Sequence, residues 1–384
     1  MNSPSAICHL SPAPRILIRG TNWLGDAVMT TPALLRLRET FPQAHITLLT
    51  PDKLRDLWAN HPAVNETISF SAGENILAIG KKLRAGKFDL ALVLPNSPRS
   101  TIETWLAGIP QRIGYARPWR NFFLTQTVPP SDDTVNMQKL SVAEIKRRTG
   151  VAPVSNSNSR LSGTKSETAA TPVLRHQIHE YLHLAAALGA NPEPLAPQLT
   201  VMPAEIAAAK KKFGLEEVSR PMFGLNPGAE YGPAKRWPIE RFIAAARRIQ
   251  QQKDCLWLMF GGKNDTPVAQ RAEIGLGGMP TVINLAGQTS LRELMALLKL
   301  CRVLLTNDSG PMHVAAALGT PVVAPFGSTS PELTGPGLSG DPRHRLLKSD
   351  ASCSPCFLRE CPIDFRCMNG ISVGRVVAAV LSIL

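Results

Sequence analysis

Residues 15–40 read RILIRGTNWLGDAVMTTPALLRLRET, and this stretch decides the fold class. A run of strand-favouring residues, Arg15–Arg19, leads through a turn bounded by Gly20 and Gly25 into an amphipathic stretch, Ala27–Thr40. A strand followed by a turn and a helix is the first part of a βαβ unit, in which helices join parallel strands. The stretch therefore predicts an α/β protein with a parallel sheet.

The same alternation continues along the chain in two blocks separated by a proline-rich stretch. In the first block we expect strands at Arg15–Arg19, His45–Thr50 and Phe88–Leu94, and helices at Ala27–Thr40, Glu74–Ala85 and His176–Leu188. In the second block we expect strands at Met222–Leu225, Leu256–Phe260, Val303–Thr306 and Val322–Pro325, and helices at Ile239–Gln251, Leu291–Leu300 and Pro311–Leu318. The blocks predict two doubly wound, Rossmann-like domains that face a cleft, with the chemistry in the loops after the strands.

Composition suggests where the domain boundaries fall. The predicted segments are a disordered N-terminal extension (1–14), a first domain (15–190) with a flexible Ser/Thr/Asn-rich insert at about 151–172, a linker (191–203), and a second domain (204–384) that ends in a cysteine-rich loop (353–367) and a C-terminal helix. At 384 residues, the chain is long enough for two such domains without disulfide bonds.

Charge and hydropathy narrow the class of partner and the compartment. The net charge of +13 favours an anionic partner, and it is spread evenly, with +7 in residues 1–200 and +6 in the remainder. No nucleic-acid-binding motif accompanies it, so we expect no nucleic acid. No run of 18 uninterrupted apolar residues is present, and the first fourteen residues carry no Lys or Arg, unlike a secretion signal. We therefore expect a cytoplasmic protein.

The turn after the first predicted strand carries a candidate catalytic carboxylate. Asp26 follows Gly25 at the start of a helix that the fold places at the cleft. One interpretation makes Asp26 an N-cap that satisfies free backbone amides. The other makes it a general base.

The first strand of the second block ends in Asn226-Pro227-Gly228-Ala229, and the loop continues to Lys235 and Arg236. Backbone amides near Gly228 with two cations before a helix form a plausible diphosphate clamp. The Gly-Lys-[Ser/Thr] ending of a Walker A loop is missing. A solvated basic loop is the alternative.

A third loop, Asn307-Asp308-Ser309-Gly310-Pro311-Met312-His313, follows the strand Val303–Thr306. Free amides at Ser309 and Gly310 suit a phosphate, and Asp308 can hold sugar hydroxyls. A hydrolase is rejected because the loop lacks a G-x-S-x-G elbow. For His313, a satisfied core histidine is the alternative to a binding role.

Together these loops resemble the ADP-heptose:lipopolysaccharide heptosyltransferases, a family of GT-B glycosyltransferases, and within it the heptosyltransferase II type. The resemblance covers most of the chain. It rests on Trp23-Leu24-Gly25-Asp26 with Thr30-Thr31-Pro32-Ala33-Leu34, on Val93-Leu94-Pro95-Asn96-Ser97, on the three loops above with Lys235-Arg236-Trp237-Pro238, on Phe260-Gly261-Gly262 and on Asn284-Leu285-Ala286-Gly287.

The resemblance implies that heptose moves from ADP-heptose to the first heptose of the lipopolysaccharide inner core, with inversion and with no metal or other cofactor. It implies that Asp26 is the base and that Lys235 stabilises the departing diphosphate. It implies donor-binding residues at Gly228, Lys235, Arg236, Gly261, Asp308, Ser309, Gly310 and His313. It implies acceptor-binding residues at Asn22, Trp23, Asn96, Arg99, Arg112 and Arg120.

The implied acceptor is the lipid A-core glycolipid. Arg99, Arg112, Arg117 and Arg120, with only Glu103 as an acid between them, suit its phosphates, although a solvated basic face is the alternative. We therefore expect peripheral contact with the cytoplasmic face of a Gram-negative inner membrane. Other functions left open are a heptosyltransferase I or III type with another core acceptor, and a non-catalytic two-lobed sugar-nucleotide-binding protein.

Four cysteines lie close together at Cys353, Cys356, Cys361 and Cys367. Thiolates at this density can close a structural zinc site, although the spacing of the second pair is unusual. Buried or surface thiols in a family-typical loop are the alternative.

Overall fold

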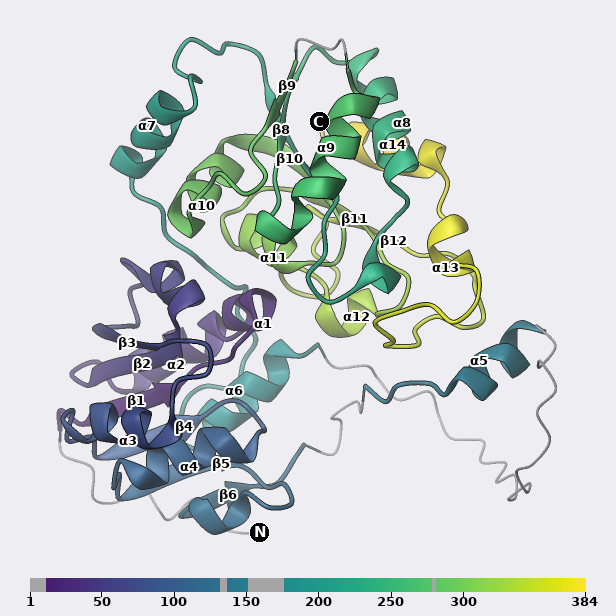
Figure 1. Ribbon diagram of the computed structural model, residues 1–384. Helices are drawn as coiled ribbons and strands as arrows, with labels where there is room; N and C mark the ends of the chain where they lie inside the picture. The colour runs from purple at the N-terminus through teal and green to yellow at the C-terminus, as the bar shows by residue number, and fades with distance from the viewer. Residues whose placement is uncertain (1–11, 132–136, 151–175, 278–280) are drawn as a thin grey trace.

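The computed structural model describes residues 12–131, 137–150, 176–277 and 281–384. The predicted N-terminal extension and the Ser/Thr-rich insert fall almost wholly outside these residues. Two lobes, each built on one six-stranded sheet with helices on its faces, lie one above the other (Figure 1). The prediction of two doubly wound α/β units is confirmed.

The first lobe is built on a parallel sheet in the order β3-β2-β1-β4-β5-β6. Its strands are β1 (Arg15–Arg19), β2 (His45–Pro51), β3 (Glu66–Phe70), β4 (Leu90–Val93), β5 (Gln111–Tyr115) and β6 (Gln126–Val128). Strand β1 lies between β2 and β4, so its carboxyl end opens at the middle of the sheet edge. Ligands of doubly wound sheets bind at this edge.

The second lobe repeats the arrangement in the order β12-β11-β10-β7-β8-β9. Its strands are β7 (Met222–Asn226), β8 (Leu256–Met259), β9 (Val282–Asn284), β10 (Cys301–Thr306), β11 (Val322–Pro325) and β12 (Arg345–Leu347). Every residue of β7 is buried, as expected for a parallel strand covered on both faces. Strands β7 and β10 pair directly, which brings the loops after them together.

Helices cover both sheets. Before the second sheet the chain forms α1 (Leu24–Met29), α2 (Thr31–Thr40), η1 (Asp52–Trp58), α3 (Ile76–Arg84), α4 (Pro98–Leu106), η2 (Asn121–Phe123), α5 (Val142–Thr149), α6 (Ile178–Ala186) and α7 (Pro203–Lys212). Within the second lobe it forms η3 (Pro233–Lys235), α8 (Ile239–Gln250), η4 (Lys263–Asp265), α9 (Thr266–Gly275), α10 (Leu291–Leu300), α11 (Gly310–Ala317), α12 (Pro331–Thr334), α13 (Arg366–Asn369) and α14 (Val373–Leu381).

The prediction of one continuous helix over Ala27–Thr40 is wrong. The chain forms α1 and α2 with a break at Thr30, whose hydroxyl donates to the carbonyl of Ala27 at 2.7 Å. Pro32 lies in the first turn of α2, where its missing N–H costs nothing. Local hydroxyl bonds and a proline thus end one helix and begin the next, which periodicity alone does not reveal.

Five short strands were also missed. Strands β3, β5, β6, β9 and β12 have three to five residues each, too few for a clear alternation of polar and apolar side chains. Their pairing with neighbouring strands defines them. The core strands β1, β10 and β11 were predicted because their apolar runs are continuous.

Helix α5 lies apart from the first sheet, although it falls within residues 15–190 (Figure 1). Its buried Ile145 packs with Cys353 and Cys356 of the cysteine-rich loop. The backbone amide of Leu140 donates to the carbonyl of Cys356 at 3.1 Å. This part of the predicted first domain therefore contacts the second lobe.

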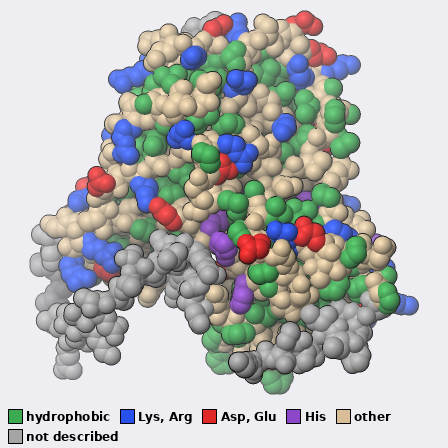
Figure 2. All heavy atoms as spheres, turned by 180° about the vertical axis from the view of Figure 1, so that it is seen from behind, with side chains coloured by type: hydrophobic (Ala, Val, Ile, Leu, Met, Phe, Trp, Pro, Cys, Tyr) green, Lys and Arg blue, Asp and Glu red, His purple; other side chains and the backbone are tan. Residues whose placement is uncertain are grey.

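Basic side chains occur on both lobes, as the even spread of positive charge along the sequence predicts. Figure 2 shows Lys and Arg spread over both lobes of one face. Within the part of the chain that the structure describes, no helix is long and apolar enough to cross a bilayer.

Candidate active site

Helix α1 presents Asp26 at the carboxyl end of β1. The helix begins at Leu24 with Trp23 as its N-cap residue, and no side chain caps it. Asp26 stands in the first turn and is partly buried. The capping interpretation of Asp26 therefore has no support in the geometry.

The first turns of α1 and α11 pack against each other and join the two lobes. A Cβ atom placed on Gly25 would lie 2.8 Å from Cδ2 of His313. A Cβ atom placed on Gly310 would lie 2.8 Å from Cδ2 of Leu24. Only glycine permits this approach without displacing the neighbour. The contact brings Asp26 of the first lobe next to the loops after β7 and β10.

The surroundings of Asp26 favour its neutral form. Burial raises the pKa of Asp26 to about 6, the nearby charge of Lys235 lowers it, and that of Asp308 raises it further. Both charges belong to the second lobe. A carboxyl with this pKa is ionised at neutral pH and is more basic than an exposed aspartate, which suits proton abstraction.

Lys235 and Asp308 form an ion pair at the same place. The Nζ atom of Lys235 lies 2.6 Å from Oδ2 of Asp308, and the carboxylate is 3% exposed. Thr329 donates to the same oxygen at 2.5 Å, and the Lys235 ammonium lies 4.9 Å from the ring centre of Tyr231. The sequence indicated Lys235 and Asp308 as candidates in two different loops, and the pairing of β7 with β10 places the two side chains next to each other. Thr329 was missed because it stands outside the quoted motifs.

Arg236 and Gly228 meet a carboxylate that the sequence analysis missed. A Cβ atom on Gly228 would lie 2.3 Å from Cγ of Asp265, and one on Gly261 would lie 2.9 Å from its Cβ. Arg236 donates to the carbonyl of Ala229 at 3.1 Å, and its Nη2 lies 3.9 Å from Oδ1 of Asp265. Asp265 follows β8 at the carboxyl edge of the sheet, and this position is the signal that would have found it.

Two asparagines fix the loops around Ser309. Asn226 donates to the hydroxyl of Ser309 at 3.1 Å and to that of Thr306 at 3.0 Å. Asn307 accepts from the backbone amide of Trp237 at 2.9 Å and donates to the carbonyl of Pro227 at 2.7 Å. Ser309 does not cap α11 through its side chain, Pro311 has no N–H, and the amide of Met312 donates to the carbonyl of Ser309 at 3.1 Å. The backbone amide of Gly310 is therefore the first-turn donor that an anion could use.

His313 is buried in α11, and burial lowers its pKa to about 4. It is therefore neutral at pH 7 and contacts the turn at Gly25. The structure gives His313 the packing position that the core alternative describes, at the junction with Asp26.

The predicted acceptor residues Asn22, Trp23 and Asn96 lie on loops after β1 and β4. All three are exposed, and Trp23 is 44% exposed. Asn22 accepts from Nη1 of the buried Arg19 at 2.9 Å. The ammonium of Lys53 lies 5.2 Å from the Trp23 ring centre. These side chains line the same sheet edge as Asp26.

The predicted acceptor arginines are held by protein groups. Arg99 pairs with the buried Glu103 at 3.1 Å, and Nε of Arg112 donates to the carbonyl of Phe123 at 2.7 Å. Arg120 is fully buried and donates to the carbonyl of Pro95 at 2.7 Å. A solvated basic face therefore describes neither Arg112 nor Arg120.

The four C-terminal cysteines form no disulfide bond. Cys353, Cys356 and Cys367 are buried, and Cys361 is partly exposed. Cys353 and Cys356 lie in an apolar cluster, and Sγ of Cys367 lies 2.9 Å from where a Cβ of Gly327 would stand. Burial raises the pKa of Cys367 to about 12 and raises the pKa values of Cys353 and Cys356. In residues 12–131, 137–150, 176–277 and 281–384, no group of three or more His, Cys, Asp or Glu is arranged to hold a metal ion. The geometry does not support the zinc alternative.

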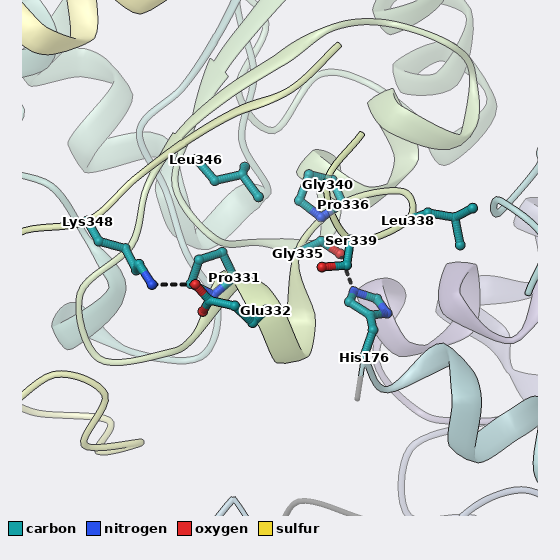
Figure 3. Close-up of a pocket in the computed structure, with 10 residues that line it drawn as sticks. All are labelled: His176, Pro331, Glu332, Gly335, Pro336, Leu338, Ser339, Gly340, Leu346 and Lys348. Atoms are coloured by element: carbon teal, nitrogen blue, oxygen red, sulfur yellow. Dashed lines mark hydrogen bonds and ion pairs between the residues drawn. The ribbon is translucent and has the colours of Figure 1, made fainter. Parts of the chain in front are cut away.

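A pocket of about 170 Å³ lies away from these residues, between α12, β12 and His176, which stands two residues before α6 (Figure 3). His176 reaches the carbonyl of Gly335 at 2.8 Å, and Lys348 forms an ion pair with Glu332. None of the predicted site residues lines it. It marks a junction between the lobes.

Two Rossmann-like lobes, each built on its own six-stranded parallel sheet, form the GT-B architecture of glycosyltransferases. The family described as "Glycosyltransferase family 9 (heptosyltransferase)" matches residues 137–365. The chain belongs to this family.

Relatives of known name support the membership of this family. The chain is 32% identical to lipopolysaccharide heptosyltransferase 2 of Escherichia coli strain K12, covering 88% of this chain and 92% of the relative. It is 32% identical to lipooligosaccharide heptosyltransferase 2 of Haemophilus ducreyi, covering 84% and 86%. Its fold is similar to the solved structure of the E. coli ADP-heptose lps heptosyltransferase II, with a TM-score of 0.73, 29% identity and coverage of 96% and 98%.

Proposed function

We propose that the protein transfers L-glycero-D-manno-heptose from ADP-heptose to the first heptose of the lipopolysaccharide inner core, with inversion at the anomeric carbon and without a metal ion. The observation that carries the proposal is the partly buried Asp26, which lies at the junction between the lobes within electrostatic reach of Lys235 and Asp308. The similarity to relatives named heptosyltransferase 2 supports the choice of donor and acceptor.

Asp26 acts as the base in this reaction. Inversion requires one displacement, in which the acceptor hydroxyl attacks the anomeric carbon, the bond to the ADP oxygen breaks and the hydroxyl proton passes to the carboxylate. Burial gives Asp26 a pKa of about 6, so the group is charged at neutral pH and still basic enough to accept the proton.

Lys235 and the backbone amide of Gly310 receive the diphosphate. Negative charge grows on the leaving ADP in the transition state, and fixed positive groups stabilise it most at that moment. The Lys235 ammonium is held by Asp308, whose other contact, from Thr329, remains when the diphosphate takes the ammonium. Gly228, Arg236, Gly261 and Ser309 complete the donor side in the proposal, and His313 supports it indirectly by packing against the turn at Gly25.

The test is a coupled measurement of ADP release with ADP-heptose and a panel of acceptors. Turnover with an acceptor that ends in the first core heptose supports the proposal. Turnover only with an acceptor lacking that heptose, or already carrying the second, assigns a heptosyltransferase I or III type instead. Undiminished turnover after exhaustive EDTA treatment is expected, and loss restored by one divalent cation contradicts metal independence.

The proposed site of action is the cytoplasmic face of the inner membrane, where the acceptor glycolipid is anchored. The excess of Lys and Arg over Asp and Glu supports contact with an anionic surface.

A further inference from the structure

The loop between β5 and β6 carries two aromatic side chains that are almost fully exposed in the described structure. Trp119 is 89% exposed and Phe122 is 93% exposed, against 48% for Trp105. Phe123 packs edge-on against Trp105, with ring centres 5.5 Å apart. We call Trp119, Phe122 and Phe123 of this loop, together with Trp105 of the neighbouring helix α4, the aromatic tip. Large exposed apolar side chains grouped in this way mark an interaction site.

Hydrogen bonds to neighbouring segments hold the loop in a fixed position. The backbone amide of Arg117 donates to the side chain of Asn121 at 2.8 Å. The buried Arg120 bonds to the carbonyl of Pro95, and Arg112 bonds to that of Phe123. The loop therefore presents the aromatic tip on a fixed base.

Trp119 has an unusual backbone conformation for a large residue. Its φ is +65°, in the left-handed region that glycine favours. A bulky side chain in this region is strained, and such strain persists where the surroundings impose it. Here the strained residue is also one of the two most exposed aromatic residues of the tip.

The segment from the end of α4 through the tip loop to β6 carries arginine and no acidic residue. Residues 104–131 contain Arg112, Arg117 and Arg120 and no Asp or Glu. Arg117 is partly exposed, and its guanidinium lies 5.9 Å from the Tyr115 ring centre. Aromatic side chains beside arginine match an anionic lipid interface, where amphipathic rings lie at the headgroups and cations attract them.

The position of the loop connects it to the candidate active site. Arg120 bonds to Pro95 and Asn96, which follow β4, and β4 pairs with β1, the strand that leads to Asp26. Figure 1 places β6 at the end of the first lobe that lies away from the second sheet. Figure 2 shows hydrophobic side chains at this lower end of the molecule.

We propose that the aromatic tip inserts into the interfacial region of an anionic lipid bilayer and anchors the first lobe there. This deepens the proposed function, because it rests on an acceptor that is itself anchored in the bilayer. The tip loop and the turn that carries Asp26 both follow strands of the first parallel sheet, after β5 and after β1. The acceptor sugars would extend from the membrane along this sheet edge to reach Asp26.

The experiment measures binding of the full chain to vesicles by co-sedimentation. Vesicles of phosphatidylcholine with phosphatidylglycerol are compared with pure phosphatidylcholine across a salt series. We expect Trp119→Ser with Phe122→Ser to lower the partition coefficient about tenfold or more, because two apolar side chains lose their burial. The matched control is Ile274→Ser, since Ile274 is 78% exposed on α9 of the other lobe and should leave binding unchanged.

Three results would overturn the inference: equal binding of the double variant and the wild type, an equal loss in the Ile274→Ser control, and a change in oligomeric state without a change in vesicle binding. The last result would assign the tip to contact with a second copy of the chain. Circular dichroism and ADP binding of the double variant, both expected to match the wild type, show that it is folded.

Activity separates this inference from the proposed function. With a deacylated, water-soluble acceptor, the double variant should turn over like the wild type. With the acceptor in vesicles, its KM should rise about tenfold, in line with the lost partitioning. Absence of heptose transfer by the wild type contradicts the proposed function and leaves vesicle binding to be judged by itself. If the wild type transfers heptose normally and the double variant binds vesicles as well as the wild type does, only this inference is contradicted.

Discussion

Asp26 concentrates the chemistry of this protein in one side chain. Its sequence position allowed either a capping role or a catalytic role, and α1 is capped at Trp23 without a side-chain bond. Asp26 instead lies at the junction of the lobes, where burial raises its pKa to about 6. This pKa fits a catalytic role better than a capping role.

Replacing Asp26 by Asn should leave ADP affinity unchanged and lower kcat about 10²- to 10⁴-fold, the usual contribution of a general base. The variant should be at least as stable as the wild type at pH 7, because an amide avoids the cost of burying a charge. Steady-state kinetics and thermal unfolding measure both. The exposed Asp254, replaced by Asn, is the control. Near-normal turnover of Asp26→Asn would remove the base role.

The pH dependence of kcat should follow the ionisation of Asp26. The carboxylate form is needed, so the rate should rise with pH through a midpoint near 6 and level off above it. In Lys235→Ala the midpoint should move to higher pH, because the Lys235 charge lowers this pKa. The stability contribution has the opposite sign. The folded pKa is raised, so the free energy of unfolding should fall as pH rises from about 4 to 6. If the pH midpoint of kcat were the same in Lys235→Ala and in the wild type, the charge of Lys235 would not act on Asp26.

Lys235→Ala should raise the KM for ADP-heptose and lower kcat, because leaving-group charge is larger in the transition state than in the ground state. The exposed Lys253, replaced by Ala, should change neither. Arg236→Ala should have a smaller effect, since Arg236 is directed toward Ala229 and Asp265. Unchanged constants in Lys235→Ala would locate the diphosphate elsewhere.

At the level of secondary structure, the N-terminal turns of α1 and α11 pack closely, because each has a glycine without a side chain at the contact. Gly25 belongs to α1 and Gly310 begins α11, and each contacts the other helix. Neither helix is strongly amphipathic at that point, so the contact is invisible to hydrophobic periodicity. It depends on the distance between two backbones.

Gly310→Ala tests this contact. The new Cβ would lie 2.8 Å from Leu24, so we expect a loss of about 1–3 kcal/mol in the free energy of unfolding and a lower kcat through displacement of α1. Gly374→Ala in α14 is the matched control, because nothing lies within 4 Å of its Cβ position. That control should be neutral or slightly stabilising. Equal stability and kcat in both variants would contradict a tight junction.

At the scale of the whole molecule, several contacts tie the lobes together. Lys53 pairs with Glu230 at 3.1 Å on the surface, and the amide of Gln177 donates to the carbonyl of Leu333 at 2.9 Å. The stretch before α7 contacts both lobes, since Gln198 bonds to Thr31 and Leu199 bonds to Ala317. Ligand binding near this junction should therefore stabilise the molecule as a unit.

ADP at a hundred times its Kd should raise the free energy of unfolding by about 2.7 kcal/mol, as mass action requires of a ligand that binds only the folded state. Thermal unfolding over a range of ADP concentrations measures this. At the same ADP concentrations the rise should be smaller in Lys235→Ala and full in Lys253→Ala. Equal stabilisation of Lys235→Ala and the wild type would show that ADP does not use Lys235.

Local sequence patterns were sufficient to predict the α/β class, the two parallel sheets and the loops that carry Asp26, Lys235 and Asp308, because buried parallel strands are continuous apolar runs and their loops carry local turn residues. Which groups meet depends on long-range packing. The ion pair of Lys235 with Asp308 joins residues 73 positions apart through the pairing of β7 with β10. The burial of Arg120, the exposure of Trp119 and the contact of α5 with the second lobe likewise depend on packing between distant segments, on which local patterns carry no information.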